Sequence, residues 1–176
     1  LRPMRRVAKP LEAMGARIEL PSHGGLPMTI FGGTLHDIDW RSEVASAQVK
    51  SAILLAALTS GVTARVVESE GTRDHTERML AARGAAIRVD GHTIDLAGGS
   101  PLEPLDTNVP GDPSSAAFFA GLAAIATGGE LRLAGVCMNE TRIGLFRRLR
   151  AMGTRFTEEH WRELGGEPVA DLIVAP

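Results

Sequence analysis

The feature that most constrains this sequence is a gapless repeat with a period of 69 residues. Glycines that each end a helical run recur at this interval: Gly15, Gly84 and Gly153. The same interval relates Ser46 to Ser115 and Thr72 to Thr141. Solenoid repeats are shorter, about 20–50 residues, whereas this period is long enough for a βαβ-type module with extra strands. We therefore expect copies of one α/β unit, with function located where the copies differ.

The composition limits the classes of protein and partner that are expected. With 44% hydrophobic and 23% charged residues, the 176-residue chain is typical of a globular protein. Its net charge of −2 gives no reason to expect a nucleic acid partner. No apolar run reaches the ~18 residues of a membrane-spanning helix, so no membrane contact is expected. The single cysteine, Cys137, favours a reducing, cytoplasmic location. The five histidines lack metal-ligand spacing, so neither a metal nor another cofactor is expected.

Apolar periodicity and turn signals predict two βαβαββ units, preceded by the last helix and hairpin of a third. The partial unit has a helix at 3–14 and strands at 16–20 and 27–31. The first full unit has strand 34–40, helix 45–59, strand 64–68, helix 74–83 and strands 85–89 and 93–96. The second has strand 105–109, helix 113–127, strand 130–134, helix 142–152, strand 154–157, a polar excursion at 160–168 and strand 171–174. The fold class is therefore α/β (α+β) with repeated units.

The first helix of each full unit is apolar on nearly every side, over residues 52–58 and 116–126. A helix without a polar face has to be buried all round, so we expect buried helices at the centre and sheets outside. At least three units sharing a helical centre would achieve this burial, and the chain has fewer. Because it starts in mid-unit and stops directly after a strand, we expect part of a longer protein. The alternative is a compact three-module domain with a degenerate first module.

The first of these helices opens with Ser46, Ala47 and Gln48, which makes its start a candidate anion site. A helix N-terminus presents unpaired N–H groups and the positive end of the helix dipole. The serine and glutamine add a hydroxyl and a carboxamide to these donors. The structural alternative is a plain serine cap, and spacing alone does not decide between the two.

The next helix is preceded by Thr72 and Arg73, and either Thr72 or Asp74 is a candidate cap. Glu77 then fits a capping-box-like first turn. Arg73 is unusual because a cation at a helix N-terminus opposes the dipole, an arrangement that a bound anion would relieve. A solvated arginine is the alternative. Arg2 lies in a similar position near the start of the first helix.

The second unit offers weaker candidates. Asp112 followed by Pro113 predicts an N-cap and a first helical residue, and the carboxylate there discourages phosphate. Arg142 mirrors Arg73 through the repeat, so it either faces the same site or preserves the fold. No pair of groups suited to acid–base catalysis is identifiable, so no catalytic residue is assigned.

Several motifs follow one another at distances that characterise one family: Arg2 to Met4, Ser46 to Ala52, Thr72 to Leu80, Gly111 to Ala116 and Asn139 to Arg142. Through them the sequence resembles the 5-enolpyruvylshikimate-3-phosphate (EPSP) synthase family essentially from end to end. The resemblance implies an enolpyruvyl-transferase-like fold, in which each of two domains has three βαβαββ units around buried helices. Residues 1–106 would belong to the first, shikimate-phosphate-binding domain, and residues 107–176 would form one unit of the second.

The resemblance also implies a function, that of a transferase in the shikimate pathway of aromatic amino acid biosynthesis. The family moves the enolpyruvyl group of phosphoenolpyruvate to the 5-hydroxyl of shikimate 3-phosphate and releases phosphate. The residues implied in binding shikimate 3-phosphate are Ser46, Ala47, Gln48 and, at its phosphate, Arg73. Gln48 and Arg2 would contact phosphoenolpyruvate, and Thr72 and Arg142 are secondary candidates.

Part of the family's machinery has no counterpart in this sequence. The N-terminal Lys, Ser and Arg are missing, as are the downstream proton-transfer carboxylates and the later cations around phosphoenolpyruvate. We therefore expect the chain alone to be inactive and its full-length parent to be an active monomer. One alternative is an enzyme similar to UDP-N-acetylglucosamine enolpyruvyl transferase. Another is a non-catalytic anion-binding or assembly module, which would self-associate through exposed strand edges and apolar helices.

Overall fold

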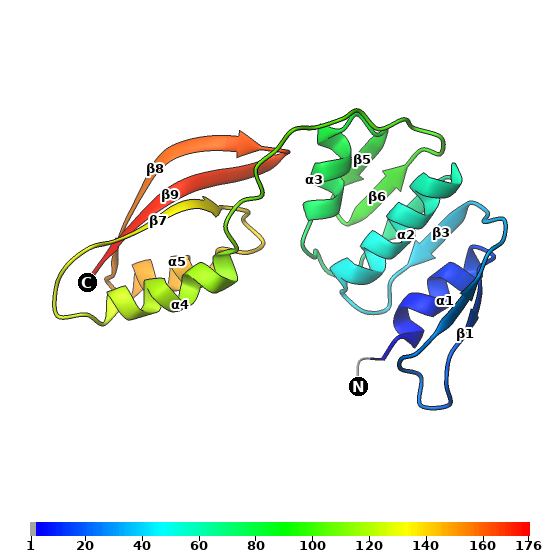
Figure 1. The fold of residues 1–176 in the computed structure, drawn as a ribbon, viewed down its shortest axis with the longest axis horizontal. Coiled ribbons are helices and arrows are strands. Elements are labelled where there is room, and N and C mark those ends of the chain that lie inside the picture. Colours follow the sequence, from blue (N-terminus) through cyan, green and yellow to red (C-terminus); the bar gives the residue numbers. More distant parts are fainter. Residues whose placement is uncertain (1–2) are drawn as a thin grey trace. The chain divides into compact units, whose positions relative to one another are not determined.

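The computed structural model describes residues 3–176, which divide into two compact units (Figure 1). One unit ends at Glu103, and the other comprises Pro104–Pro176. Arg2, a candidate ligand for phosphoenolpyruvate, lies outside the described residues.

The first unit begins with helix α1 (Arg5–Ala13) and a two-stranded antiparallel hairpin, β1 (Arg17–Glu19) and β2 (Thr29–Phe31). A four-stranded sheet in the order β3-β4-β6-β5 follows. Its elements alternate along the chain: β3 (Ile38–Arg41), α2 (Ala47–Ser60), β4 (Ala64–Val67), α3 (His75–Ala82), β5 (Ile87–Asp90) and β6 (Thr93–Leu96). Strands β3 and β4 are parallel and joined by α2, whereas β6 is antiparallel to both of its neighbours.

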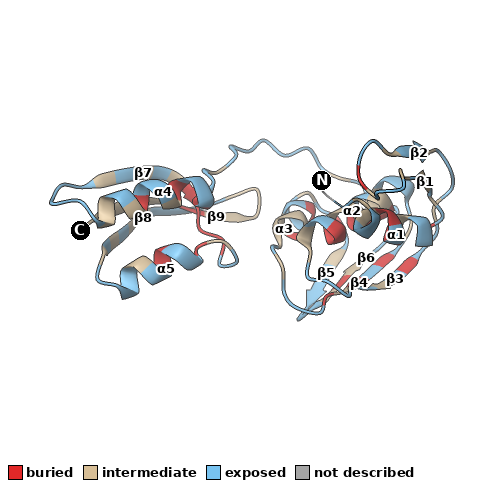
Figure 2. Cartoon of the chain, turned by 90° about the horizontal axis from the view of Figure 1, so that it is seen from below, coloured by how far each residue is buried: buried red, intermediate tan, exposed pale blue. Residues whose placement is uncertain are grey.

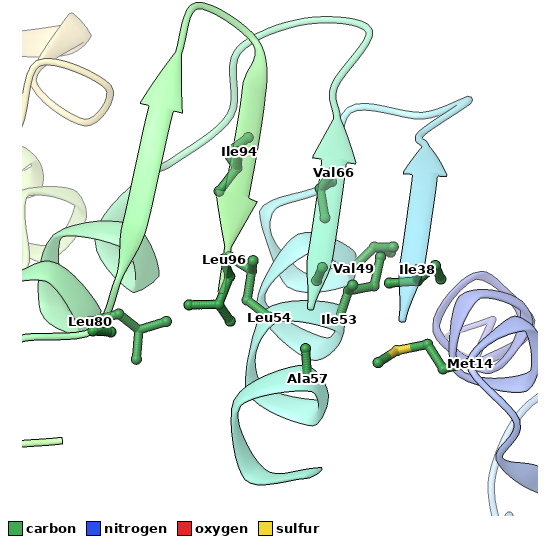
Figure 3. Close-up of a cluster of buried hydrophobic side chains, with 12 residues drawn as sticks. Met14, Ile38, Val49, Ile53, Leu54, Ala57, Val66, Leu80, Ile94 and Leu96 are labelled. Carbon is green, nitrogen blue, oxygen red and sulfur yellow. The ribbon is translucent and has the colours of Figure 1, made fainter. Parts of the chain in front are cut away.

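The core of the first unit lies between α2 and this sheet (Figure 3). Ile53 and Leu54 of α2 are fully buried against strand residues such as Val66 and Leu96. Their burial fixes which side of α2 faces the sheet. It therefore also fixes where the first turn of the helix lies.

The second unit has a three-stranded antiparallel sheet in the order β7-β9-β8, packed against two helices. Its elements are α4 (Pro113–Ala124), β7 (Leu131–Cys137), α5 (Gly144–Ala151), β8 (Arg155–Leu164) and β9 (Glu167–Ala175). The prediction that Asp112 caps α4 is confirmed, since its carboxylate accepts from the backbone N–H groups of Ser114 and Ser115 at 3.1 and 3.3 Å.

The three repeated glycines end α1, α3 and α5 in the same manner. Gly15, Gly84 and Gly153 all have positive φ, at 106°, 81° and 105°. The residue after each glycine donates its N–H to a carbonyl in the last turn of the helix: Ala16 to Leu11, Ala85 to Leu80 and Thr154 to Leu149. This pattern is the Schellman motif, which places glycine at the left-handed position. The 69-residue period of the sequence therefore corresponds to the spacing between the C-terminal ends of these three helices.

Two predicted elements of the second unit are wrong. Residues 105–109 form no strand, and the adjoining segment contributes a single parallel bridge from Gly111 to Val136. The polar excursion at 160–168 is part of a long hairpin, in which β8 runs to Leu164 and turns at Gly165 and Gly166 into β9. One face of this hairpin is open to solvent, so its strands carry polar side chains that obscure the strand pattern.

The expectation that the apolar helices are buried all round is not met within this chain. On α2 most side chains are buried or half-buried, and Leu55 is 40% exposed. Helix α4 buries the side that faces its sheet and exposes the opposite side (Figure 2). The exposure reaches 82% for Phe118 on α4 and 81% for Ile125 at its C-cap. No other element of the second unit covers that face.

Candidate functional site

The N-terminus of α2 presents the first candidate group. Ser46 is the N-cap and accepts a long hydrogen bond, 3.5 Å, from the backbone N–H of Val49. It lines a cavity of about 80 Å³ that Arg6 and Trp40 also line. The Ser46 hydroxyl therefore has the position of a serine N-cap, which was the structural alternative considered from the sequence.

Gln48 lies on the exposed side of the first turn of α2, where Arg6 fixes its orientation. The Nη2 of Arg6 donates to Oε1 of Gln48 at 3.1 Å. Arginine has donors only, so this contact holds the carbonyl oxygen of the carboxamide toward α1. The Nε2–H groups of Gln48 remain available to another acceptor.

The starts of α2 and α3 line one hollow of about 430 Å³. The α2 side contributes Ala47, Gln48 and Ser51, and the other side contributes Arg73, His75 and Thr76. Arg73 is exposed and makes no hydrogen bond or ion pair within residues 3–176. The structure thus brings together three of the residues singled out from the sequence, Ala47, Gln48 and Arg73, on two helix starts that favour anions.

The secondary candidates do not line this hollow. The Thr72 hydroxyl donates to Oε1 of Glu68 at 2.5 Å. Arg142 lies in the second unit, where its Nη2 donates to Oδ1 of Asp112 at 2.6 Å and to Oγ of Ser114 at 2.8 Å. These contacts join Arg142 to the first turn of α4 and its cap, as the fold-preserving alternative requires.

Lys50 of α2 and Glu77 of α3 belong to a buried ion-pair cluster that the sequence analysis did not predict. Lys50 Nζ lies 2.9 Å from Oε2 of Glu68 and 2.6 Å from Oε1 of Glu77. Its side chain is almost completely buried in a helix that otherwise reads as apolar. Glu77 does not form the predicted capping box: its side chain turns inward to Lys50 instead. At the N-cap, Asp74 pairs with Arg78 and makes no side-chain capping bond.

In the second unit a carboxylate, Asp171, lies at the centre of a charged cluster. The backbone N–H of Gly135, donated at 2.8 Å, is the main reason that the pKa of Asp171 lies far below its usual range. Hydrogen bonds from His160, Arg132 and Arg162 lower that pKa further. The contacts span irregularities in both strand pairings, at Gly135 in β7 and near His160 in β8. Asp171 thus holds two bulged strands in place.

Other kinds of site receive no support within residues 3–176. They contain no group of three or more His, Cys, Asp or Glu side chains that is arranged to hold a metal ion. No helix in this part of the chain is both long and apolar enough to cross a membrane. The thiol of Cys137 is buried, and this desolvation raises its pKa, which disfavours the nucleophilic thiolate.

Comparisons with known proteins agree on one family. The family model described as EPSP synthase (3-phosphoshikimate 1-carboxyvinyltransferase) matches residues 1–176. A 3-phosphoshikimate 1-carboxyvinyltransferase from Alkalilimnicola ehrlichii is 51% identical over 98% of this chain and 39% of its own length. That of Aquifex aeolicus is 47% identical over 99% of this chain and 42% of its own length. An EPSP synthase structure from Acinetobacter baumannii is 46% identical, with a TM-score of 0.88, over 99% of this chain and 40% of that one.

These comparisons confirm the resemblance and the fold class inferred from the sequence. The chain spans about 40% of the length of the curated relatives that it matches.

Proposed function

The chain belongs to the EPSP synthase family, and on that premise we propose that it carries the shikimate 3-phosphate half of an enolpyruvyl transferase site. The complete enzyme would transfer the enolpyruvyl group of phosphoenolpyruvate to the 5-hydroxyl of shikimate 3-phosphate and release phosphate. The observation that carries this proposal is the convergence of Gln48 and Arg73 on one hollow between two helix starts.

The chemistry of the hollow suits a phosphate monoester. Two helix N-termini supply unpaired N–H groups and positive potential. Arg73 supplies a planar cation that can donate two hydrogen bonds to phosphate oxygens. Gln48, with its carbonyl held by Arg6, supplies neutral Nε2–H donors to a second group of the ligand. Charge-assisted contacts of this kind are each worth about 1.5–3 kcal/mol.

In this proposal the chain binds the substrate, and residues outside the chain carry out proton transfer. No acid–base pair in the hollow is placed to move a proton to or from the enolpyruvyl carbon. Purified chain alone should therefore form no product.

We assign residues 1–106 to the shikimate-phosphate-binding domain and residues 107–176 to the second domain of the family. We place the protein in the cytoplasm, in keeping with its single cysteine, Cys137.

Calorimetric titration of shikimate 3-phosphate into the chain tests the proposal. We expect saturable binding that is weakened at least tenfold by Arg73→Ala, since tenfold corresponds to ~1.4 kcal/mol. Arg88→Ala is the matched control, because Arg88 is an exposed arginine on β5 that does not line the hollow. Its affinity should equal that of the unmodified chain.

Two outcomes would contradict the proposal. Displacement of shikimate 3-phosphate by UDP-N-acetylglucosamine at comparable concentration would favour the related transferase instead. Absence of binding in a sample with a cooperative unfolding transition would show that this chain does not hold the ligand alone. A non-catalytic anion-binding or assembly module would then be the better description.

A further inference from the structure

Arg73 has no partner of its own within residues 3–176, so its position depends on the backbone that carries it. That backbone is the segment from Glu68, which follows β4, to the start of α3. The residue directly before Arg73 is Thr72, and the Thr72 hydroxyl donates to Glu68 Oε1 at 2.5 Å. The hydrogen bond closes the segment on itself immediately beside the arginine.

The second oxygen of Glu68 connects the same segment to the neighbouring helix. Glu68 Oε2 lies 2.9 Å from Nζ of Lys50, which is only 1% exposed. Lys50 lies in the first turn of α2, two residues beyond Gln48. An unbroken series of contacts therefore runs from the helix start that carries Gln48 to the residue that precedes Arg73.

Further contacts fix the two helices relative to each other. Lys50 also pairs with Glu77 of α3 at 2.6 Å. The hydroxyls of Ser51 and Thr76 are 2.7 Å apart, between the same two helices. These contacts hold α2 against α3, and the bond from Thr72 to Glu68 then fixes the segment that leads into α3.

We propose that Lys50, Glu68 and Thr72 form a positioning series that sets where Arg73 lies relative to the start of α2. The inference rests on the proposed function, because it concerns how the shikimate 3-phosphate site is held in shape. Thr72 is then a positioning residue that acts through Arg73 and does not touch the ligand. Stability alone is a poor explanation of such a cluster, because buried ion pairs are often no more stable than apolar replacements.

The test uses Thr72→Val, which removes the hydroxyl at nearly constant volume and leaves the pairing of Lys50 with Glu68 in place. Hydrogen exchange at the backbone amides of residues 69–74 should become faster, while exchange in β4 and β6 should be unchanged. Affinity for shikimate 3-phosphate should fall roughly tenfold, as expected for one hydrogen bond to a charged group. Thr72→Ser keeps the hydroxyl and should restore both properties.

A double-mutant cycle separates positioning from an ordinary structural role. If Thr72 acts through Arg73, the variant Thr72→Val/Arg73→Ala binds no more weakly than Arg73→Ala alone. Independent, additive losses would overturn the inference. Unchanged exchange of residues 69–74 in Thr72→Val would overturn it as well, whether or not the ligand binds. If the unmodified, folded chain binds no shikimate 3-phosphate, the proposed function fails and the inference fails with it as a statement about this site.

Discussion

The Nζ atom of Lys50 lies 2.6 Å from Oε1 of Glu77, although the two side chains are only 2% and 5% exposed. Glu68 pairs with the same ammonium, so two carboxylates share one cation in the interior of the first unit. The second oxygen of Glu77 is buried and accepts no hydrogen bond within residues 3–176. Removing the cation would leave two buried carboxylates without charge compensation.

We therefore expect Lys50→Met to lower the free energy of unfolding of the first unit by about 3–5 kcal/mol, the usual effect of breaking a buried ion pair from one side. Adding Glu68→Gln and Glu77→Gln should recover most of this loss, because the uncompensated charges disappear. Trp40 reports on this unit in a Trp161→Phe background during denaturant unfolding. An equal loss in the triple variant would show that packing, and not charge, sets the effect.

The anionic character of the ligand can be tested at Gln48. Gln48→Glu preserves the shape of the side chain but places a negative charge at the edge of the hollow, beside Arg6. Affinity for shikimate 3-phosphate should fall more than in Gln48→Ala, which loses only a hydrogen bond worth about 0.5–1.5 kcal/mol. Titrations at low and high salt provide the measurement, because the difference between the two variants should shrink as salt screens the added charge. Equal affinities at low salt would contradict an anion in this place.

Acid should destabilise the second unit through Asp171. Its pKa in the folded state lies below the unfolded value of about 3.9, so its contribution to stability is present above that pH. The contribution is lost as the pH falls from about 4 toward the folded pKa. Asp171→Asn should therefore flatten the pH dependence in this range, as followed by Trp161 fluorescence in a Trp40→Phe background. Glu163→Gln, at an exposed carboxylate of the same hairpin, should leave the slope unchanged.

The exposed face of α4 should cause association. Phe118, Leu122 and Ile125 follow one another at helical spacing and are 82%, 66% and 81% exposed. Sedimentation velocity should show larger species as the concentration rises, since large exposed apolar patches mark interaction surfaces. Phe118→Glu/Ile125→Glu should suppress these species. Met152→Glu changes a comparably exposed residue, 80%, at the C-cap of α5 and should leave these species in place. If Met152→Glu also suppresses them, association is not specific to the face of α4.

Much of the fold could be predicted because helix ends are encoded locally. The glycines that end α1, α3 and α5 are required by a left-handed backbone conformation, so their spacing gives the repeat directly. The part of the β8–β9 hairpin at residues 160–168 was missed for the opposite reason, although strands were predicted on either side of it. Its solvent-facing side chains, such as His160 and Arg162, are polar, and their local pattern resembles a loop although the strands are stabilised by pairing along their length.

Only the exposed part of the candidate site, at the starts of α2 and α3, could be predicted from the sequence. Helix starts can be read locally, so Gln48 and Arg73 could be proposed as candidate anion ligands from the sequence, and the structure adds that both line one hollow. Lys50 could not be identified, because its partner Glu68 lies 18 residues away and is brought near by the β-strand between them. Glu77 was misassigned for a similar reason: a glutamate three residues after a cap fits a capping box equally well when its side chain points inward.

The residues of the hollow and of the Lys50 ion pairs all come from one uninterrupted stretch of chain, from Ser46 to Glu77. A single genetic exchange can therefore move the whole set between relatives without separating the arginine from the contacts that position it. Exchanges whose boundaries fall inside this stretch would pair a lysine from one parent with carboxylates from another. Chimaeras built with junctions before Ser46 and after Glu77 should consequently inherit phosphate recognition as a single trait.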